Sequence, residues 1–528
     1  AEYDNIYDNI KLEKNNKFCD VELIKNKGKI IYNMFTDKRK IATMLMFVAL
    51  CLLYYTLTIP SNSIWGDQIQ AINIAKDILE GNFPLHGYKH SNGMYSFPAF
   101  YYFVAPLVFI SDEPMFLYGS VAFLYIVGVL LLANYTYNKF GFFESSLFLF
   151  FSATHVWSLF FTSFFWNPNY IPFFMSLFII FLSKQINERS SVIYFHVSGI
   201  LLNIIVQMMP QSIILIPAFA FILFLFKRLP SLLNQVLHLF IQLILVYPWI
   251  HYYLFILDWE KVKTTGKFFK NFSAFIEYFN FLGGMLLTSE RIKYASYGTN
   301  TYPFENFFDS LLMTSSILLL IMIMYSIYLT FSKISYINLF NLQIKPMNGI
   351  DLEKQKLFMA LSIINFSCVL FFITGMHMTP HHYQFLTPLL AFNLTLLASF
   401  KQLKKIITPL LLLCILMQGS FSYWRAYSEY KKPYVTDIGY SDQFTNYITN
   451  NCNAESTAYI LDPSGLNFFQ SSKGDHDKKS CGKLILVLRD HYTQSEIIRW
   501  FLKKNYAKTD MKFKDYLIWS RKNIKEHE

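Results

Sequence analysis

The sequence has few charged residues: Asp, Glu, Lys and Arg make up 15% of its 528 residues, whereas soluble chains carry about a quarter. Hydrophobic residues make up 54%. A chain of this composition cannot cover its surface with polar groups, which excludes an ordinary soluble protein. The apolar residues fall in runs of roughly 15–25, the length that crosses about 30 Å of hydrocarbon. We therefore expect lipid to be the solvent for most of the chain.

Cysteine is also scarce, with six residues and no CxxC motif. This excludes the common zinc-binding and thiol redox motifs, and we expect no organic cofactor. Cys452 and Cys481 are the two cysteines near the C-terminus. In an oxidising compartment they could pair, or they could remain separate thiols, and the sequence leaves both open.

The formal net charge of +11 suggests nucleic acid at first sight. Much of this charge, however, lies in short loops between apolar runs, where Lys and Arg orient membrane helices. We therefore expect membrane lipids and no nucleic acid as partners. Intramembrane polar residues are expected to form hydrogen bonds between helices; they are Glu144, His155, His196, Gln207, His238 and Gln242.

The apolar runs predict about eleven membrane-spanning helices. These are Ile41–Ile59, Met115–Tyr137, Phe142–Phe165, Tyr170–Leu182, Ser191–Met209, Ser212–Phe226, Ser231–Leu257, Phe307–Phe331, Leu357–Met376, Tyr383–Phe400 and Ile406–Tyr423. Lys38, Arg39 and Lys40 precede the first run and predict a cytoplasmic N-terminus. With an odd number of spans, the C-terminus lies outside. Phe97–Ile110 must then lie at the outer interface, because counting it as a span inverts every later loop.

The predicted fold class is mostly α: a polytopic transmembrane helical domain with a small C-terminal α/β soluble domain. Residues 1–40 form a cytoplasmic segment, 41–424 the transmembrane domain with outer loops 60–114 and 258–306, and 425–528 an extracytoplasmic domain. Strands are expected at Ala458–Leu461, Leu484–Leu488 and Asp515–Trp519, and helices at Asp442–Thr449 and Ser495–Asn505.

The first outer loop carries a candidate site. Asp67 begins an amphipathic stretch that ends at Glu80, and Gly81 can close the helix. We expect this helix to lie flat on the outer leaflet. Asp67 can serve as a helix N-cap, a role compatible with a catalytic one. Further along, a turn rich in Gly and His precedes Pro98-Ala99-Phe100-Tyr101-Tyr102.

An outer Asp after the first span, a flat helix, a Gly- and His-bearing turn and a Pro-x-x-Tyr-Tyr segment together resemble the GT-C superfamily. The likeness is greatest to the protein O-mannosyltransferase and lipid A aminoarabinose transferase branch, over roughly residues 41–400. It implies a glycosyltransferase that moves a sugar from a polyprenyl-phosphate carrier to an acceptor on the outer face, with inversion. Asp67 would then be the base or the group that orients the acceptor, and Tyr101 a substrate contact.

The leaving group of that reaction is a lipid phosphate, which needs positive charge nearby. The outer cations that could supply it are Lys89, Lys261, Lys263, Lys267, Lys270, Arg291 and Lys293, and His90 could donate as well. Basic residues in 258–306 run against the charge rule that the short outer loops obey. Adhesion to anionic headgroups is the alternative explanation.

Two further outer corners resemble the family. Asn167 and Asn169 stand where some relatives place an acid, and these amides weaken the case for a carboxylate-bound metal. His377, His381, His382 and Tyr383 lie at the start of a late span, where relatives often have Arg-Tyr. Three histidines within six residues also suggest a metal, but we favour contacts with the sugar phosphate, and metal dependence stays open.

The expected partners are a polyprenyl-phosphate sugar donor and an acceptor that is a protein, a lipid or a glycan. The expected location is the bacterial cytoplasmic membrane, with the active site and the C-terminal domain outside. The alternatives are a transporter or flippase, or a ligase, of lipid-linked glycans. Transporters tend to show internal repeats and polar sites at the membrane midplane, and this sequence has no repeat of fixed period.

Overall fold

The computed structural model describes residues 37–60, 66–87, 95–188, 192–257, 304–338, 341–347, 350–373, 384–431, 450, 457–462, 465–471, 483–487, 506–513 and 516–521. It divides into two units, Ala1–Leu50 and Cys51–Glu528. The described part of the first unit is the beginning of helix α2. The boundaries predicted at residues 40 and 424 stay predictions.

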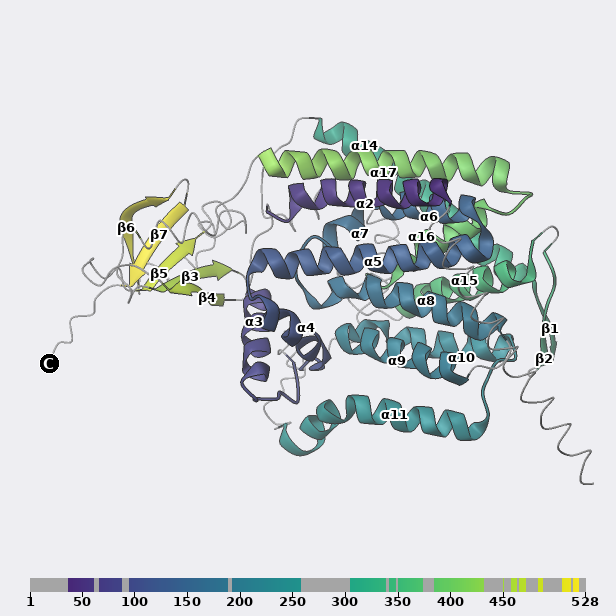
Figure 1. Ribbon diagram of the computed structural model, residues 1–528, viewed down its shortest axis with the longest axis horizontal. Coiled ribbons are helices and arrows are strands. Elements are labelled where there is room, and N and C mark those ends of the chain that lie inside the picture. The colour runs from purple at the N-terminus through teal and green to yellow at the C-terminus, as the bar shows by residue number, and fades with distance from the viewer. Residues whose placement is uncertain are drawn as a thin grey trace, which may run out of the picture. The chain divides into compact units, whose positions relative to one another are not determined.

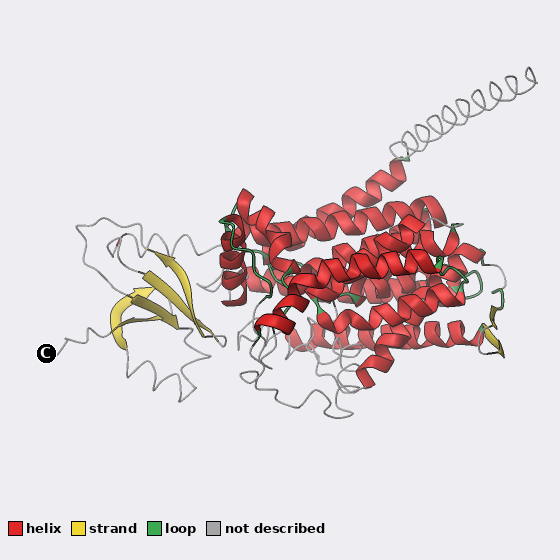
Figure 2. Ribbon diagram, turned by 90° about the horizontal axis from the view of Figure 1, so that it is seen from below, coloured by secondary structure: helices red, strands yellow, loops and turns green. Residues whose placement is uncertain are grey.

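Helices make up most of the described residues (Figure 2). They are α2 Lys38–Thr58, α3 Gly66–Leu79, α4 Ala99–Ile110, α5 Pro114–Phe140, α6 Phe142–Ser152, α7 Val156–Phe161, α8 Ile171–Asn187, α9 Val192–Met208, α10 Leu215–Leu225, α11 Leu232–His251, α14 Glu305–Ser332, α15 Leu352–Ile373, α16 Leu386–Ala398 and α17 Lys404–Lys431.

Six of the described helical stretches are long and apolar enough to cross a membrane. They are Lys38–Thr58, Pro114–Phe140, Asn167–Asn187, Leu232–Ile256, Asn306–Ser332 and Lys404–Ser428. The chain is therefore an integral membrane protein. The other five predicted spans, over α6–α7, α9, α10, α15 and α16, stay predictions. Helix α4 has 12 residues and is about 18 Å long, too short to cross about 30 Å of hydrocarbon.

The predicted span Phe142–Phe165 is interrupted between α6 and α7. At the break, the carbonyl oxygens of Ser152, Ala153 and Thr154 accept hydrogen bonds from side chains of other helices. Tyr125 of α5 donates to the first at 2.8 Å, and Tyr423 of α17 donates to the second at 3.0 Å. The break is tolerated because the freed backbone groups find partners in protein rather than in lipid.

A row of polar side chains joins α9 to α11. The two Nδ1 atoms of His196 and His238 lie 3.1 Å apart, and the Gln242 amide lies 3.0 Å from His238. Asn203 donates to Gln242 at 2.5 Å. Hydrogen bonds of this kind hold membrane helices together at about 1 kcal/mol each. The expectation of helix-to-helix hydrogen bonds is confirmed for these residues.

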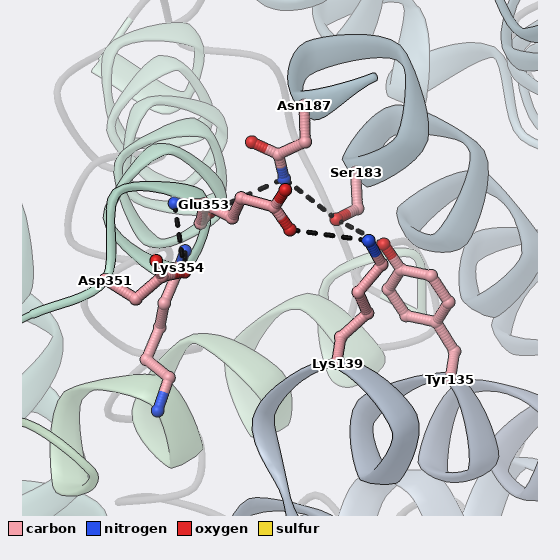
Figure 3. Close-up of polar contacts among 7 residues, drawn as sticks. All are labelled: Tyr135, Lys139, Ser183, Asn187, Asp351, Glu353 and Lys354. Carbon is pink, nitrogen blue, oxygen red and sulfur yellow. Dashed lines mark hydrogen bonds and ion pairs between the residues drawn. The ribbon is translucent and has the colours of Figure 1, made fainter.

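The basic residues of several predicted cytoplasmic loops meet at one end of the helices, which we call the basic end (Figure 3). Lys139, near the end of α5, pairs with Glu353 at the start of α15 at 3.4 Å. Asn187, which ends α8, donates to the backbone oxygen of Glu353 at 3.5 Å. Tyr135 and Ser183 join α5 to α8 nearby at 2.8 Å. The gathering of these loops agrees with the predicted topology, while the side of the membrane stays a prediction.

The opposite end carries α3, which runs across the direction of α5 and α8 (Figure 1). We call it the α3 end. Here Ser120 of α5 and Tyr170, just before α8, lie 2.8 Å apart through their hydroxyls. Asn167 donates to the carbonyl oxygen of Met208, at the end of α9, at 2.7 Å. Two of the corners predicted to lie outside, at Asn167 and after Met208, therefore meet at this end.

Strands form two separate sheets. Strands β1 Ile334–Asn338 and β2 Asn341–Ile344 form a hairpin between α14 and α15. The second sheet has the order β4-β3-β5-β7-β6. Its strands are β3 Thr457–Asp462, β4 Gly465–Ser471, β5 Lys483–Val487, β6 Tyr506–Phe513 and β7 Tyr516–Arg521. Strands β3 and β5 pair in parallel, and the other pairs are antiparallel.

The three strands predicted near the C-terminus correspond to β3, β5 and β7. Strands β4 and β6 were not predicted, and both lie at sheet edges, where one side of a strand is unpaired and the sequence carries a weaker pattern. The two predicted helices, Cys452 and Cys481 lie outside the described residues, so the α/β class of this domain stays a prediction.

The ion pair between Lys354 and Glu144 can be used to test whether buried charges at the basic end stabilise the fold more than exposed ones. Its atoms lie 2.6 Å apart, and the two side chains are 15% and 9% exposed. Lys354→Met leaves a buried carboxylate without its partner, which costs about 3 kcal/mol, so we expect a clearly lower denaturation midpoint in detergent. Lys139→Met breaks a pair that is 33% and 44% exposed, which costs about 1 kcal/mol or less. Equal effects of the two substitutions would contradict this description.

Candidate functional site

Asp67 occupies the second position of α3, which confirms the helix predicted to begin there. Most other predicted site residues lie outside the described residues. They are Lys89, His90, Lys261, Lys263, Lys267, Lys270, Arg291, Lys293, His377, His381, His382 and Tyr383. The described part of the site consists of α3, the chain from Glu80 to Gly87, Tyr95 to Ile110, and the corners that surround them.

Helix α3 packs on α4. Its buried residues are Gln68, Ala71, Ala75 and Ile78, spaced as on one face of a helix. Leu79 is 45% exposed. The buried face includes the small residues Ala71 and Ala75, and α3 packs beside α4. The exposed apolar side chains of α3 are available to lipid.

An ion pair fixes the second half of α3. Lys76 Nζ lies 2.5 Å from Asp112 in the connection between α4 and α5. The hydrogen bond from Lys76 lowers the pKa of Asp112 below its ordinary value. The ion pair therefore stabilises the fold at a pH above the pKa that Asp112 has in the unfolded state. This stabilisation is lost as the pH falls through the lowered pKa of Asp112 in the folded state. Both side chains are about half exposed, so the contribution is at most about 1 kcal/mol.

Gly81 ends α3 as predicted. Its φ of +94° lies in the left-handed region, and Asn82 donates from its backbone N–H to the carbonyl of Asp77 at 2.9 Å. This is the hydrogen-bond pattern of a glycine C-cap. The chain thereby reverses and returns toward α4.

Gly87 lies where two parts of the first outer loop touch. Its N–H donates to the carbonyl of Ser96 at 2.7 Å. A Cβ at this position would overlap the Ser96 hydroxyl and lie 2.8 Å from both the Phe97 carbonyl oxygen and the Tyr101 ring. Tyr101 is buried at 2% exposure, packed beside Gly87. Tyr101 therefore packs inside the first outer loop and helps to fix its conformation.

The end of α11 is fastened to the same loop. The backbone N–H of Tyr95 donates to the hydroxyl of Tyr253 at 2.7 Å, and Trp249 donates to the carbonyl of Tyr95 at 3.1 Å. Phe97 stacks on Trp249, with ring centres 4.5 Å apart. After His251 the chain makes a π-helical turn, Tyr252–Ile256, a feature common at functional sites. The described chain before the predicted basic loop, up to Leu257, therefore lies next to the first outer loop.

His86 was not singled out from the sequence. Its Nδ1 lies 2.7 Å from the carbonyl oxygen of Gly87, so this nitrogen carries the proton, because a carbonyl only accepts. The imidazole lies between Tyr95 and Tyr252, with ring centres 4.3 and 4.0 Å away. The packing of His86 between two tyrosines could not be predicted from the sequence, because Tyr252 is distant from His86 along the chain.

Asn167 and Asn169 lie in the corner before α8. Asn167 is 8% exposed and Asn169 is 1% exposed. The amide nitrogen of Asn169 donates to the Phe164 carbonyl at 2.9 Å, as that of Asn167 does to Met208. Both side-chain oxygens are buried without a hydrogen-bond partner among the described residues. Each residue therefore stabilises the corner through its amide nitrogen, while its side-chain oxygen has no hydrogen-bond partner among the described residues.

Two more buried polar residues were missed. Gln384 is fully buried just before α16, and neither atom of its amide has a partner in the described part of the chain. Arg425 is 5% exposed near the end of α17, next to Trp424, which stacks on Phe308 at 4.5 Å. The sequence prediction ended the span at Tyr423 and assigned Arg425 to a soluble domain. The burial of Arg425 became visible only because α17 continues to Lys431.

A metal site is not apparent in the described ranges, which contain no group of three His, Cys, Asp or Glu residues that could hold an ion. The predicted histidines of the late corner lie outside these ranges. Metal dependence therefore stays open.

Comparison with known proteins gives matches in structure only. The sequence matches no protein-family model and no curated protein. The crystal structure of ArnT from Cupriavidus metallidurans in the apo state superposes with a TM-score of 0.51 at 9% identity, covering 90% of this chain and 97% of that one. The chain has the fold of ArnT. At this identity the likeness shows the fold alone, and the resemblance predicted from the sequence is confirmed at that level.

Two other structures are similar. ArnT bound to undecaprenyl phosphate gives a TM-score of 0.50 at 8% identity, again with 90% of this chain and 97% of that chain covered. The archaeal oligosaccharyltransferase AglB from Archaeoglobus fulgidus, in complex with an inhibitory peptide and a dolichol-phosphate, gives 0.41 at 12% identity, with 74% of this chain and 56% of that one covered.

The packing at Gly87 can be tested with two alanine substitutions. Gly87→Ala places a methyl group against the backbone oxygen of Phe97, which cannot rotate away, so we expect the first outer loop to shift and the denaturation midpoint to fall. Gly119→Ala is the control, since nothing lies within 4 Å of its Cβ position on α5, and alanine favours a helix by up to about 1 kcal/mol. A Gly87→Ala protein as stable as Gly119→Ala would contradict the close packing.

Proposed function

We propose that this protein is a membrane glycosyltransferase that moves a sugar from a polyprenyl-phosphate carrier to an acceptor at the α3 end. The observation that carries the proposal is the ArnT fold over 90% of the chain, combined with an Asp in the first turn of a crosswise helix directly after the first span. The structure of ArnT bound to undecaprenyl phosphate supports a lipid phosphate as the carrier.

Asp67 is the proposed base or acceptor-orienting group. A hydroxyl acceptor is a poor nucleophile at neutral pH, and removal of its proton by a positioned carboxylate contributes about 10²–10⁴ in rate. Direct displacement at the anomeric carbon would invert its configuration. The acceptor is a protein, a lipid or a glycan.

The proposed phosphate contacts are cations at the α3 end. The candidates predicted from the sequence remain: Lys89, His90, the basic residues of 258–306, and His377, His381, His382 and Tyr383 at the start of the late span. The end of α11 is attached to Tyr95 of the first outer loop. This supports a role in phosphate binding for residues 258–306, because that segment follows directly after Leu257 in the sequence. Arg425 joins this group as a buried cation. Guanidinium groups bind phosphate through paired hydrogen bonds.

The role of Asp67 can be tested by Asp67→Asn. This change preserves size and capping ability but removes the base, so release of polyprenyl phosphate from the sugar donor in membranes should fall by about 10²–10⁴. The control is Asp77→Asn on the exposed side of the same helix, which should retain activity. Asp67→Asn activity within a few-fold of the unaltered protein would remove Asp67 from the mechanism.

The proposed location is the bacterial cytoplasmic membrane, with the α3 end and the C-terminal domain outside. A reporter fused after Glu528 should therefore register as extracytoplasmic, because an odd number of spans follows a cytoplasmic N-terminus. A cytoplasmic signal would show that the number of crossings is even, and Phe97–Ile110 would be the first candidate for the miscounted segment.

A further inference from the structure

Two positive charges lie near each other at the basic end. Arg228 follows α10, and Lys356 lies near the start of α15. The two charges repel each other, while Glu353 attracts Lys356. The Glu353 carboxylate, however, is already paired with Lys139 at 3.4 Å (Figure 3). Within the described ranges, neither Arg228 nor Lys356 has an ion-pair partner.

The fold holds Arg228 in this place. Its backbone N–H donates to the carbonyl of Leu223 at 2.7 Å, and Lys227 before it has a φ of +55°. This is a Schellman turn, whose left-handed position usually carries glycine. The Arg228 side chain donates from Nε to the carbonyl of Ile186 in α8 at 3.2 Å, and its backbone carbonyl accepts from Gln185 at 3.2 Å. The two outer nitrogens of the guanidinium have no partner among the described residues.

Sorting across the membrane explains why Lys and Arg are present at this end, but it does not explain this arrangement. Cations that only orient helices can spread apart into water. Arg228 and Lys356 are instead partly buried and held near each other. Two like charges in such a place raise the free energy of the fold unless an anion contacts both. The arrangement therefore indicates a bound anion.

The apolar surroundings indicate that this anion belongs to a lipid. Leu232 and Leu233, at the start of α11, are 75% and 77% exposed, and α11 has no buried residue. On the side of Lys356, the predicted span begins at the next residue, Leu357. Arg228 and Lys356 therefore lie where hydrocarbon gives way to headgroups. A phospholipid places its phosphate at this level and its acyl chains along the exposed leucines.

We propose that Arg228 and Lys356 bind the headgroup phosphate of an anionic phospholipid at the basic end. Arg228 donates to the phosphate from its outer nitrogens and Lys356 from its ammonium group, so one anion attracts both cations. The lipid thereby joins α8 and α15 to the turn before α11, a helix that otherwise packs mainly on α9. This site lies at the end opposite the proposed glycosyl transfer and does not depend on it.

The test compares two phospholipids with the same acyl chains, dioleoyl phosphatidylglycerol and dioleoyl phosphatidylcholine. Each is titrated into the delipidated protein in detergent, with native mass spectrometry for bound lipid and a parallel measurement of the denaturation midpoint. Phosphatidylglycerol should bind more tightly and raise the midpoint further. The phosphatidylcholine headgroup carries its own ammonium group, so it gains less from the two cations.

Lys356→Gln removes one cation and leaves the hydrogen bond from Arg228 to α8. Its affinity for phosphatidylglycerol should fall roughly fivefold or more. Without lipid its denaturation midpoint should be no lower than that of the unaltered protein, because the repulsion is removed. Arg228→Gln should lose at least as much affinity, but it also loses the contact with Ile186, so Lys356→Gln is the deciding variant.

Lys405→Gln is the matched control, because it changes the net charge equally at an exposed lysine of the basic end. The neighbouring Lys404 lies over the ring of Phe143, beside Glu144. The affinity of Lys405→Gln for phosphatidylglycerol should not change.

Equal binding of the two lipids would overturn the inference. Equal losses of affinity in Lys356→Gln and Lys405→Gln would do the same, since binding would then follow the surface charge alone. A rise of the midpoint with inorganic phosphate as large as that with phosphatidylglycerol would indicate a soluble anion and rule out the lipid. A Lys356→Gln protein that binds as before but unfolds more readily without lipid would show that this lysine serves the fold and not a ligand.

Discussion

The absence of water from the hydrocarbon layer is the constraint on which the rest of this structure depends. A backbone group left unpaired there costs several kcal/mol, so each departure from a regular helix must bring its own partners. The break between α6 and α7 is the clearest case, since Tyr125 and Tyr423 reach its carbonyls from α5 and α17. The same need explains the side chains that join α9 to α11. Elsewhere in the described residues, irregular backbone lies at the ends of the helices, where water and substrates can reach it.

The two ends use polar groups differently. At the basic end, charges neutralise one another: Lys354 with Glu144 and Lys139 with Glu353. These pairs fix the ends of the helices that carry them. At the α3 end, aromatic rings and backbone hydrogen bonds fasten the first outer loop to α11, while buried amides retain unused atoms.

Much of the helical architecture could be predicted from the sequence, because long apolar runs have few alternatives in a membrane. The start of α3 near Asp67 and its end at Gly81 followed from local patterns that do not depend on the rest of the fold. The break at residues 153–155 could not be predicted, since the hydroxyls that make it tolerable come from Tyr125 and Tyr423, both distant in sequence. Arg425 was missed for a similar reason: α17 continues past the predicted end of the span to Lys431 and packs beside other helices, α14 among them. His86 and Gln384 also depend on neighbours that only the fold supplies.

The central claim is that the α3 end binds a lipid phosphate that carries a sugar. It is tested most directly by photocrosslinking with a polyprenyl phosphate whose reactive group lies next to the phosphate, followed by mass spectrometry of the labelled peptides. The account predicts labels in the first outer loop, in the corner at Asn167 and Asn169, and in the last turns of α17 around Arg425. Labels confined to the basic end, around Lys139, Asn187 and Glu353, would contradict it.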